Sequence, residues 1–199
     1  MVRTVEIMVY SDEYKFIFFA VPKTGSRTIQ DYLQDYGIRS PKGWAPNHDN
    51  YEQVKKRLGD ERFERYFKFS FFRNPWSLLI STFFYNRHKF NLPPDKNNVI
   101  WWLNSYRGTD PYAPYIFDKN GNVALDFIGK LEHIKKDLRE VCEKISIPVP
   151  ETLAQTGKQS VKGRLYYTEY YEDLRLRERI KEIFAKSNSV LNYTFSEGI

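Results

Sequence analysis

Two segments of the sequence share one pattern, in which an apolar run leads through a polar turn into an amphipathic helix. Residues 15–21 form a continuous aromatic and β-branched run, and residues 66–72 become apolar throughout at their end. Continuous apolar runs are typical of strands that are covered on both faces, as in parallel sheets. Helical periodicity follows over residues 28–36 and again from Pro75 onward. Two such units predict an α/β fold with right-handed crossover helices.

The remaining segments carry more local signals. Residues 91–114 are rich in Asn, Pro, Tyr and Trp and lack clear periodicity, which predicts a lid or an insertion on the substrate side. Asn120 and Gly121 stand between two alternating runs and predict a β-hairpin. With 199 residues the chain has the length of one ordinary domain, so residues 1–199 are expected to fold as a single unit. Further helices are predicted over residues 51–58, with N-caps among residues 47–50 and Gly59 as the C-cap, and over residues 132–145 and 170–185.

Charge and cysteine content narrow the class of partner. The formal charge of +6 favours an anionic ligand, but the basic residues are spread along the chain, so nucleic acid is not the expected partner. Cys142 is the single cysteine, which excludes an internal disulfide and a multi-cysteine metal cage, and no metal is expected. It shares an apolar helical stripe with Leu138 and Val141, which predicts a buried thiol.

No apolar run approaches the roughly 20 residues that are needed to span a bilayer, and the first residues lack the apolar core of a secretory signal. We therefore expect no membrane partner and an intracellular protein. The sequence does not indicate the oligomeric state.

The turn after the first apolar run has the composition of an anion site. The first N–H groups of a helix are unpaired and its dipole is positive there, so a turn between a parallel strand and a helix attracts phosphate or sulfate. Gly25 permits a tight backbone, while Lys23, Ser26 and Thr28 add a positive charge and hydroxyl donors. The nucleotide-triphosphate pattern G-x-x-x-x-G-K-[ST] is absent because the lysine precedes the glycine. ATP hydrolysis and a small-molecule kinase are thereby disfavoured.

The order Pro-Lys-Thr-Gly-Ser at residues 22–26 resembles the loop with which sulfotransferases bind 3′-phosphoadenosine 5′-phosphosulfate (PAPS). The segment "FKFSFFRNPWSLLIS" resembles the 3′-phosphate motif of the same family. Residues 126–147 and the tail from residue 170 resemble the carbohydrate (Golgi-type) branch and its small bacterial relatives. The resemblance implies the sulfotransferase variant of a P-loop-like parallel sheet flanked by helices. It also implies transfer of the PAPS sulfuryl group to a hydroxyl of a carbohydrate or glycoconjugate.

The resemblance assigns roles to individual residues. The ammonium of Lys23 would reach the oxygen that bridges phosphate and sulfate, where a fixed positive charge lowers the barrier to transfer. Arg73 and Ser81 would bind the 3′-phosphate, since position 81 lies about two helical turns after Arg73. The backbone amides expected to hold the 5′-phosphosulfate belong to Lys23, Thr24, Gly25, Ser26, Arg27 and Thr28.

Other residues have a functional and a plain interpretation of similar weight. His48 stands where relatives that sulfate uronic acids have a catalytic base, but a histidine in a loop can also serve as a cap. Lys162 and Arg164 are candidates for a second contact to the 3′-phosphate, or belong to a solvated loop. Trp44, Trp101 and Trp102 can stack on sugar rings or pack in the core.

The sequence also departs from the family pattern. Arg27 stands where relatives have a small residue, and Ser77-Leu78 stands where they have Asp-Arg. These departures keep open a non-catalytic module that binds PAPS or its product, 3′-phosphoadenosine 5′-phosphate (PAP). A basic binder of single-stranded nucleic acid is the third alternative. Because eukaryotic carbohydrate sulfotransferases usually have a membrane anchor, the resemblance implies a bacterial or viral cytoplasmic protein, unless the sequence is part of a longer chain.

Overall fold

The computed structural model describes residues 8–39, 50–153 and 165–197. It divides the chain into two compact units. One consists of Met1–Phe72 with Tyr112–Gly157, and the other of Arg73–Pro111 with Lys158–Ile199. The expectation that the whole chain acts as one domain stays a prediction.

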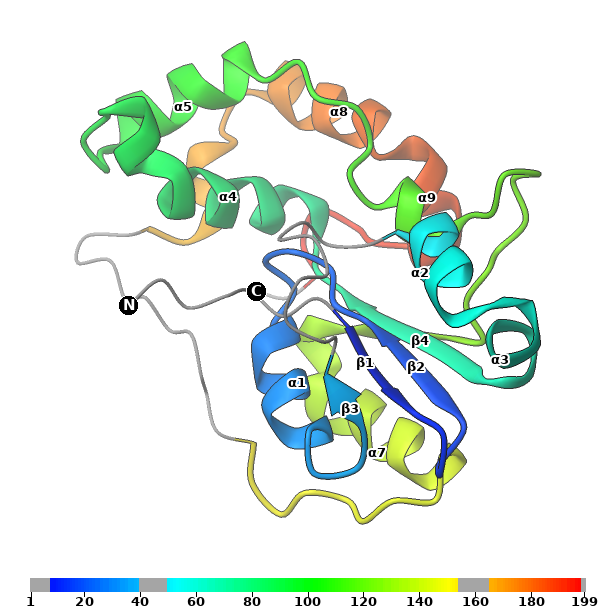
Figure 1. Ribbon diagram of the computed structural model, residues 1–199. Coiled ribbons are helices and arrows are strands. Elements are labelled where there is room, and N and C mark those ends of the chain that lie inside the picture. The colour runs from blue at the N-terminus through cyan, green and yellow to red at the C-terminus, as the bar shows by residue number, and fades with distance from the viewer. Residues whose placement is uncertain (1–7, 40–49, 154–164, 198–199) are drawn as a thin grey trace. The chain divides into compact units, whose positions relative to one another are not determined.

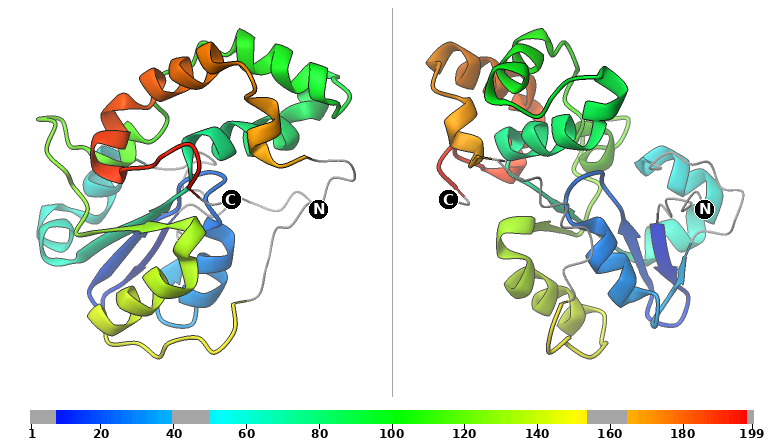
Figure 2. Two further views of the ribbon diagram at one scale, coloured as in Figure 1. Left: turned by 180° about the vertical axis from the view of Figure 1, so that it is seen from behind. Right: turned by 90° about the vertical axis from the view of Figure 1, so that its left-hand side faces the viewer.

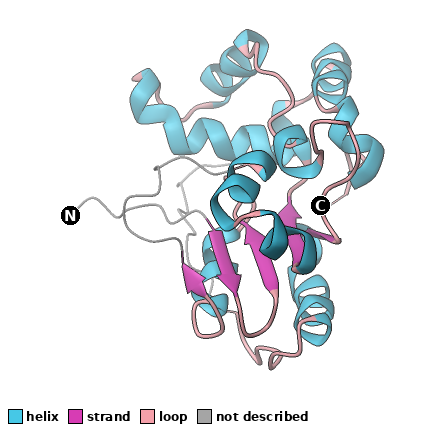
Figure 3. Ribbon diagram, turned by 45° about the vertical axis from the view of Figure 1, so that its right-hand side comes forward, coloured by secondary structure: helices cyan, strands magenta, loops and turns pink. Residues whose placement is uncertain are grey.

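The first unit is built on a sheet with the strand order β3-β1-β2-β4-β5 (Figure 3). Strands β2, β4 and β5 run parallel to one another, as the two apolar runs predicted. Strand β1 pairs antiparallel with β2 because only the turn at residues 12–15 separates them, and parallel strands need a long crossover. It also pairs antiparallel with β3. The strands are β1 (Met8–Ser11), β2 (Phe16–Phe19), β3 (Ile38–Arg39), β4 (Phe67–Phe72) and β5 (Phe127–Lys130).

Two helices cover one face of this sheet, α1 (Ser26–Leu33) and α7 (Ile134–Lys144) (Figures 1 and 2). A short 3-10 helix, η1 (Leu131–His133), joins β5 to α7. The core between the helices and the sheet contains Phe16, Phe18, Ile29, Leu33, Phe69, Phe71, Leu138, Val141 and Cys142. The predicted burial of the single thiol is thus confirmed.

Three further helices belong to the first unit: α2 (Tyr51–Leu58), α3 (Asp60–Arg65) and α6 (Ala113–Ile116). Asn50 caps α2 through a reciprocal pair of hydrogen bonds with Gln53, which is the arrangement of a capping box. Gly59 ends α2 with a φ of 81°. The helix predicted before Gly59 is therefore present, but α3 follows it immediately and was not predicted.

The hairpin prediction at Asn120 and Gly121 is only half right. The turn forms, and Phe117 makes one antiparallel bridge with Val123. The second run continues instead into β5, which pairs parallel with β4. Pairing with a central strand buries the second run better than an isolated two-stranded hairpin would.

The second unit is helical in its described part (Figure 3). Helix α5 occupies the segment whose weak periodicity predicted a lid or insertion. The helix predicted over residues 170–185 is present as α8, but it is shorter than predicted. It begins after its N-cap Asp173, and Phe184, with φ −94° and ψ 10°, separates it from α9. No helix in the described ranges is long and apolar enough to cross a membrane. The helices are α4 (Pro75–Phe90), α5 (Lys96–Ser105), the 3-10 helix η2 (Tyr167–Tyr170), α8 (Leu174–Ile183) and α9 (Ala185–Leu191).

The buried lysine of β4 supplies a first test of the fold. The ammonium of Lys68 lies 3.0 Å from the carboxylate of Asp126 and donates to the carbonyl of Tyr66 at 2.8 Å. Asp126 also accepts the backbone N–H of Lys68 at 2.7 Å. Asp126→Ala should lower the free energy of unfolding by about 2 kcal/mol, because it leaves a buried charge without its counter-ion. Urea unfolding followed by circular dichroism measures the change.

A matched control is Glu172→Ala, which removes the exposed partner of Lys96 at 2.6 Å in the second unit. Exposed pairs contribute less than about 1 kcal/mol, so this variant should unfold near the wild-type midpoint. Equal decreases in the free energy of unfolding would show that the ion pair between Lys68 and Asp126 contributes no more to stability than an exposed pair does.

Cys142 supplies a second test. Burial raises the pKa of its thiol, so at pH 8 the folded protein holds less of the reactive thiolate than the unfolded chain. Ellman's reagent should therefore label native protein only as fast as it opens, and urea-unfolded protein at once. Immediate stoichiometric labelling without denaturant would contradict the packing of α7 on the sheet.

Candidate active site

The turn between β2 and α1 has a constrained backbone. Lys23 has a φ of 65° and Gly25 a φ of 76°, so two residues within three adopt left-handed conformations. Such a conformation is unfavourable for lysine, and the surrounding structure must enforce it. Thr24, fully buried between them, donates from Oγ1 to the carbonyl of Val21 at 2.9 Å. The Thr24 hydroxyl thus holds the turn together, and only its backbone N–H can serve a ligand.

Gly25 is required for a second reason. A Cβ atom at this position would lie 2.5 Å from Leu131 Cδ1 and 3.9 Å from Ile134 Cδ1. The turn after β2 therefore packs directly against the residues that follow β5. Only glycine allows this close approach with a positive φ.

Helix α1 begins with an open N-terminus. Gly25 is its N-cap and has no side chain with which to cap it, and the first turn contains no acidic residue. The backbone N–H of Thr28 returns to the carbonyl of Gly25 at 3.0 Å. Ser26 and Thr28 are half-buried and Arg27 is exposed. The helix start thus combines a positive dipole with polar side chains, and its first turn contains no carboxylate.

Helix α4 begins in the opposite way. The side-chain oxygen of Asn74 accepts from the backbone N–H of Trp76 at 3.1 Å and of Ser77 at 3.4 Å. Pro75 has no N–H to offer. Because the first donors of α4 are already bound, an anion at this turn must be held mainly by side chains.

Arg73 supplies such a side chain. It directly follows Phe72, the last residue of β4, and its Nε donates to Ser77 Oγ at 2.8 Å. Ser81 lies one helical turn after Ser77 on the same face of α4, and both serines are 7% exposed. Sequence analysis noted Ser77 only as a departure from the family pattern. The structure shows that it contacts Arg73.

Parallel pairing brings the carboxyl ends of β2 and β4 to one edge of the sheet. Phe19 and Ser70 are partners in the β2–β4 register, and Ser70 Oγ donates to the Phe19 carbonyl at 2.7 Å. Neighbouring strands lie about 4.8 Å apart. The chain therefore leaves β2 after Phe19 and β4 after Phe72 at the same carboxyl edge, which is where α/β sheets bind ligands.

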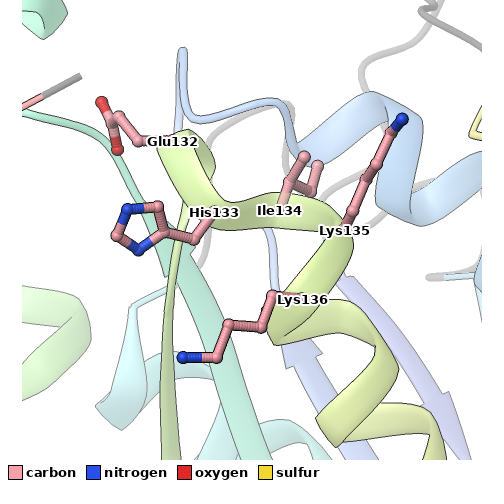
Figure 4. A pocket seen from close by; sticks show the side chains of 5 residues that line it. All are labelled: Glu132, His133, Ile134, Lys135 and Lys136. Atoms are coloured by element: carbon pink, nitrogen blue, oxygen red, sulfur yellow. The ribbon is translucent and has the colours of Figure 1, made fainter. Parts of the chain in front are cut away.

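An open hollow of about 490 Å³ lies at the end of β5, the third parallel strand (Figure 4). Lys130, the last residue of β5, pairs with Phe72 of β4. Ile134, which lines the hollow, also lies close to Gly25. In Figure 4 the side chains of Glu132 and His133 point to one side of the ribbon and that of Lys135 to the other. Sequence analysis assigned no role to His133, which stands directly before α7. The described lining residues are Glu132, His133, Ile134, Lys135 and Lys136.

Several residues singled out in the sequence lie outside the described ranges. The proposed base His48, the candidate contacts Lys162 and Arg164, and Trp44 belong to this group. Among the described tryptophans, Trp101 is 59% exposed, whereas Trp102 packs against Phe83 and Tyr106. Within the described residues no three His, Cys, Asp or Glu side chains come together as a metal site would require.

Comparison with known proteins agrees with this arrangement. Residues 7–101 match the sulfotransferase family, and the match includes both turns and Ser81. An uncharacterized protein of Archaeoglobus fulgidus is 34% identical over 102 residues, which make up 48% of this chain and 80% of that protein. No solved structure shows a significant match. The chain belongs to the sulfotransferase family.

Gly25 offers a test of the site geometry. Gly25→Ala should lower the free energy of unfolding by about 3 kcal/mol, because it adds a clash with Leu131 to an unfavourable φ. Gly121→Ala is the matched control, since Gly121 has a φ of 85° but open space around it. The control should cost about 1 kcal/mol. Equal decreases in the free energy of unfolding for the two variants would mean that the Leu131 side chain moves aside and that its contact does not fix the turn.

Proposed function

We propose that the protein is a PAPS-dependent sulfotransferase that acts on a hydroxyl group of a carbohydrate or glycoconjugate. One observation supports this proposal above the others: two adjacent parallel strands end in an open helix start and in an arginine, within the segment that matches the family. A donor with phosphate groups at both the 5′ and the 3′ position of one ribose needs two anion sites.

The turn after β2 is proposed to hold the 5′-phosphosulfate. Backbone amides of residues 23–27 would donate to its oxygens, as helix starts do for phosphate. The amide of Thr28, also expected from the sequence, already donates to the carbonyl of Gly25, so Thr28 would contribute its hydroxyl instead. The ammonium of Lys23 would sit at the oxygen that bridges phosphorus and sulfur. Negative charge grows on this oxygen during transfer, so a positive charge held there stabilises the transition state.

The turn after β4 is proposed to hold the 3′-phosphate. The guanidinium of Arg73 presents donors in a planar fork that matches two phosphate oxygens. Ser77 binds the Nε of Arg73, which orients the fork. Ser81 adds a hydroxyl from the same helix face. Lys162 and Arg164 remain proposed second contacts.

The proposed reaction is a direct in-line transfer. The acceptor hydroxyl oxygen forms a new bond to sulfur while the bond from sulfur to the bridging oxygen breaks. The electron pair of that bond stays on the 5′-phosphate, and PAP leaves. The hydroxyl proton passes to a base, for which His48 is the proposed residue. His133 is a second candidate because it stands at the hollow beside the turn.

The choice of a sugar hydroxyl as acceptor rests on the resemblance to the carbohydrate branch. The exposed indole of Trp101 is compatible with this choice, because an aromatic face suits the apolar face of a pyranose. The basic charge of the chain is also compatible with an anionic glycan.

The proposal predicts distinct defects for the two anion sites. Lys23→Ala should lower kcat for transfer of labelled sulfate to a mixed glycan panel by about 100-fold, with little change in PAP affinity. Arg73→Ala should weaken PAP binding by about 30-fold in calorimetry. Lys119→Ala and Arg87→Ala are matched controls that remove exposed or peripheral charges and should behave as wild type.

A separate comparison of His48→Gln with His133→Gln identifies the base. The variant that lacks the base should lose the acidic limb in the pH profile of kcat.

The outcomes separate the three functions. Tight PAP binding without transfer to any hydroxyl acceptor would support the non-catalytic module. Salt-sensitive binding of oligonucleotides, with no affinity for PAP, would support the nucleic-acid binder. Equal PAP affinity in wild type and Arg73→Ala would remove the argument for a 3′-phosphate site.

A further inference from the structure

Asn74 joins the start of α4 to the end of the chain. It is fully buried, and its side-chain amide donates to the carbonyls of Thr194 and Glu197, both at 2.9 Å. Its side-chain oxygen caps α4 through Trp76 and Ser77. All four hydrogen bonds thus radiate from one side chain, which fastens the residue after Arg73 to the C-terminal segment 194–197.

The C-terminal segment is itself held by an aromatic cluster around Phe195. The ring of Phe195 meets Trp76 edge-on at 5.5 Å, Tyr167 at 5.6 Å and Tyr171 at 5.9 Å. The guanidinium of Arg177 lies 4.3 Å from the centre of the same ring, within cation–π distance. Packing of the Phe195 ring therefore fixes the segment that carries the two carbonyls to which Asn74 donates.

Trp76, in the first turn of α4, connects this helix to the aromatic cluster. Its indole N–H donates to the carbonyl of Arg177 at 3.1 Å, and its own carbonyl accepts from the hydroxyl of Tyr171 at 3.0 Å. Burial raises the pKa of Tyr171 well above its usual value, so this hydroxyl keeps its proton as a donor at any working pH. The start of α4 is thus tied to the surrounding elements at both Asn74 and Trp76.

The tie reaches Arg73 through Ser77. The backbone N–H of Ser77 binds Asn74, and its hydroxyl accepts from Arg73 Nε at 2.8 Å. A long arginine side chain loses conformational freedom when it binds an anion, and fixing its direction in advance reduces that loss. The contacts therefore run unbroken from Phe195 to the guanidinium.

We propose that Asn74 is a positioning residue for Arg73, and that the C-terminal segment 194–197 is a functional part of the 3′-phosphate site. The inference rests on the proposed function and extends it, because it assigns donor selectivity to residues that need not touch the donor. If the proposal is right, Asn74 affects the affinity for the 3′-phosphate and does not act only through the stability of the second unit.

The test compares two nucleotides that differ only in the 3′-phosphate, PAP and adenosine 5′-monophosphate (AMP), by competition calorimetry. Asn74→Ser keeps an oxygen that can cap α4 but loses the amide donors to the C-terminal carbonyls. The ratio of AMP to PAP dissociation constants should fall about tenfold, through weaker PAP binding alone. Phe195→Ala, which changes no residue of α4 but removes the ring that packs on Trp76, should lower the ratio in the same direction.

Two controls separate positioning from stability. Leu103→Ala truncates a fully buried side chain of α5 and lowers the melting temperature without touching this network, so it should leave the ratio unchanged. In the Arg73→Ala background, Asn74→Ser should have no further effect on the ratio, since the residue it positions is gone. Should Asn74→Ser fail to fold, Phe195→Ala tests the contribution of the C-terminal segment, and Ser77→Ala tests the bond from Ser77 to Arg73.

The outcomes distinguish this inference from the proposed function. Wild type with no preference for PAP over AMP would overturn the proposed 3′-phosphate site itself. A wild-type preference that survives in Asn74→Ser, Ser77→Ala and Phe195→Ala would overturn the positioning role alone. A fall in the ratio that persists in the Arg73→Ala background would also overturn it, because the effect would not pass through Arg73.

Discussion

The parallel pairing of β2 with β4 is the constraint on which the rest of the site depends. Parallel strands must end at the same edge, so the residues after Phe19 and after Phe72 leave the sheet side by side. Both strands are buried, which makes a slip in register costly. The hydrogen bond from Ser70 to the carbonyl of Phe19 ties the pair close to that edge. The two turns that are proposed to bind anions follow these neighbouring strand ends in the chain.

The two turns differ in the hydrogen-bond donors that they can offer to an anion. The first offers backbone donors, since Gly25 leaves α1 uncapped and Leu131 supports the turn from behind. The second has its backbone donors occupied by Asn74 and relies on the side chain of Arg73. Backbone donors are rigid and suit a group on which charge changes, whereas a guanidinium fork suits a phosphate that is only held. In the proposed function, the backbone donors would therefore serve the reacting 5′ end and the guanidinium the non-reacting 3′ end.

Much of this arrangement was predictable because strong local patterns coincide with the tertiary environment. The apolar runs of β2 and β4, Pro75 at the first position of α4 and the buried Cys142 were all predicted. Strand β1 and helix α3 were missed because short elements depend on their neighbours for stability. The second half of the predicted hairpin became β5, since an exposed β4 edge was available to it. Local propensity cannot register such a competition.

The sequence by itself determined the strand–turn–helix units, the family and the residue types at each turn, because these follow from periodicity and from motifs a few residues long. Only the tertiary structure decided that Leu131 supports Gly25, that Ser77 orients Arg73 and that Asn74 binds Thr194. The contacts of Gly25 and of Asn74 join residues far apart in the chain. Hydrogen bonds and van der Waals contacts act over a few ångströms, so folding must bring such partners together before either can be recognised.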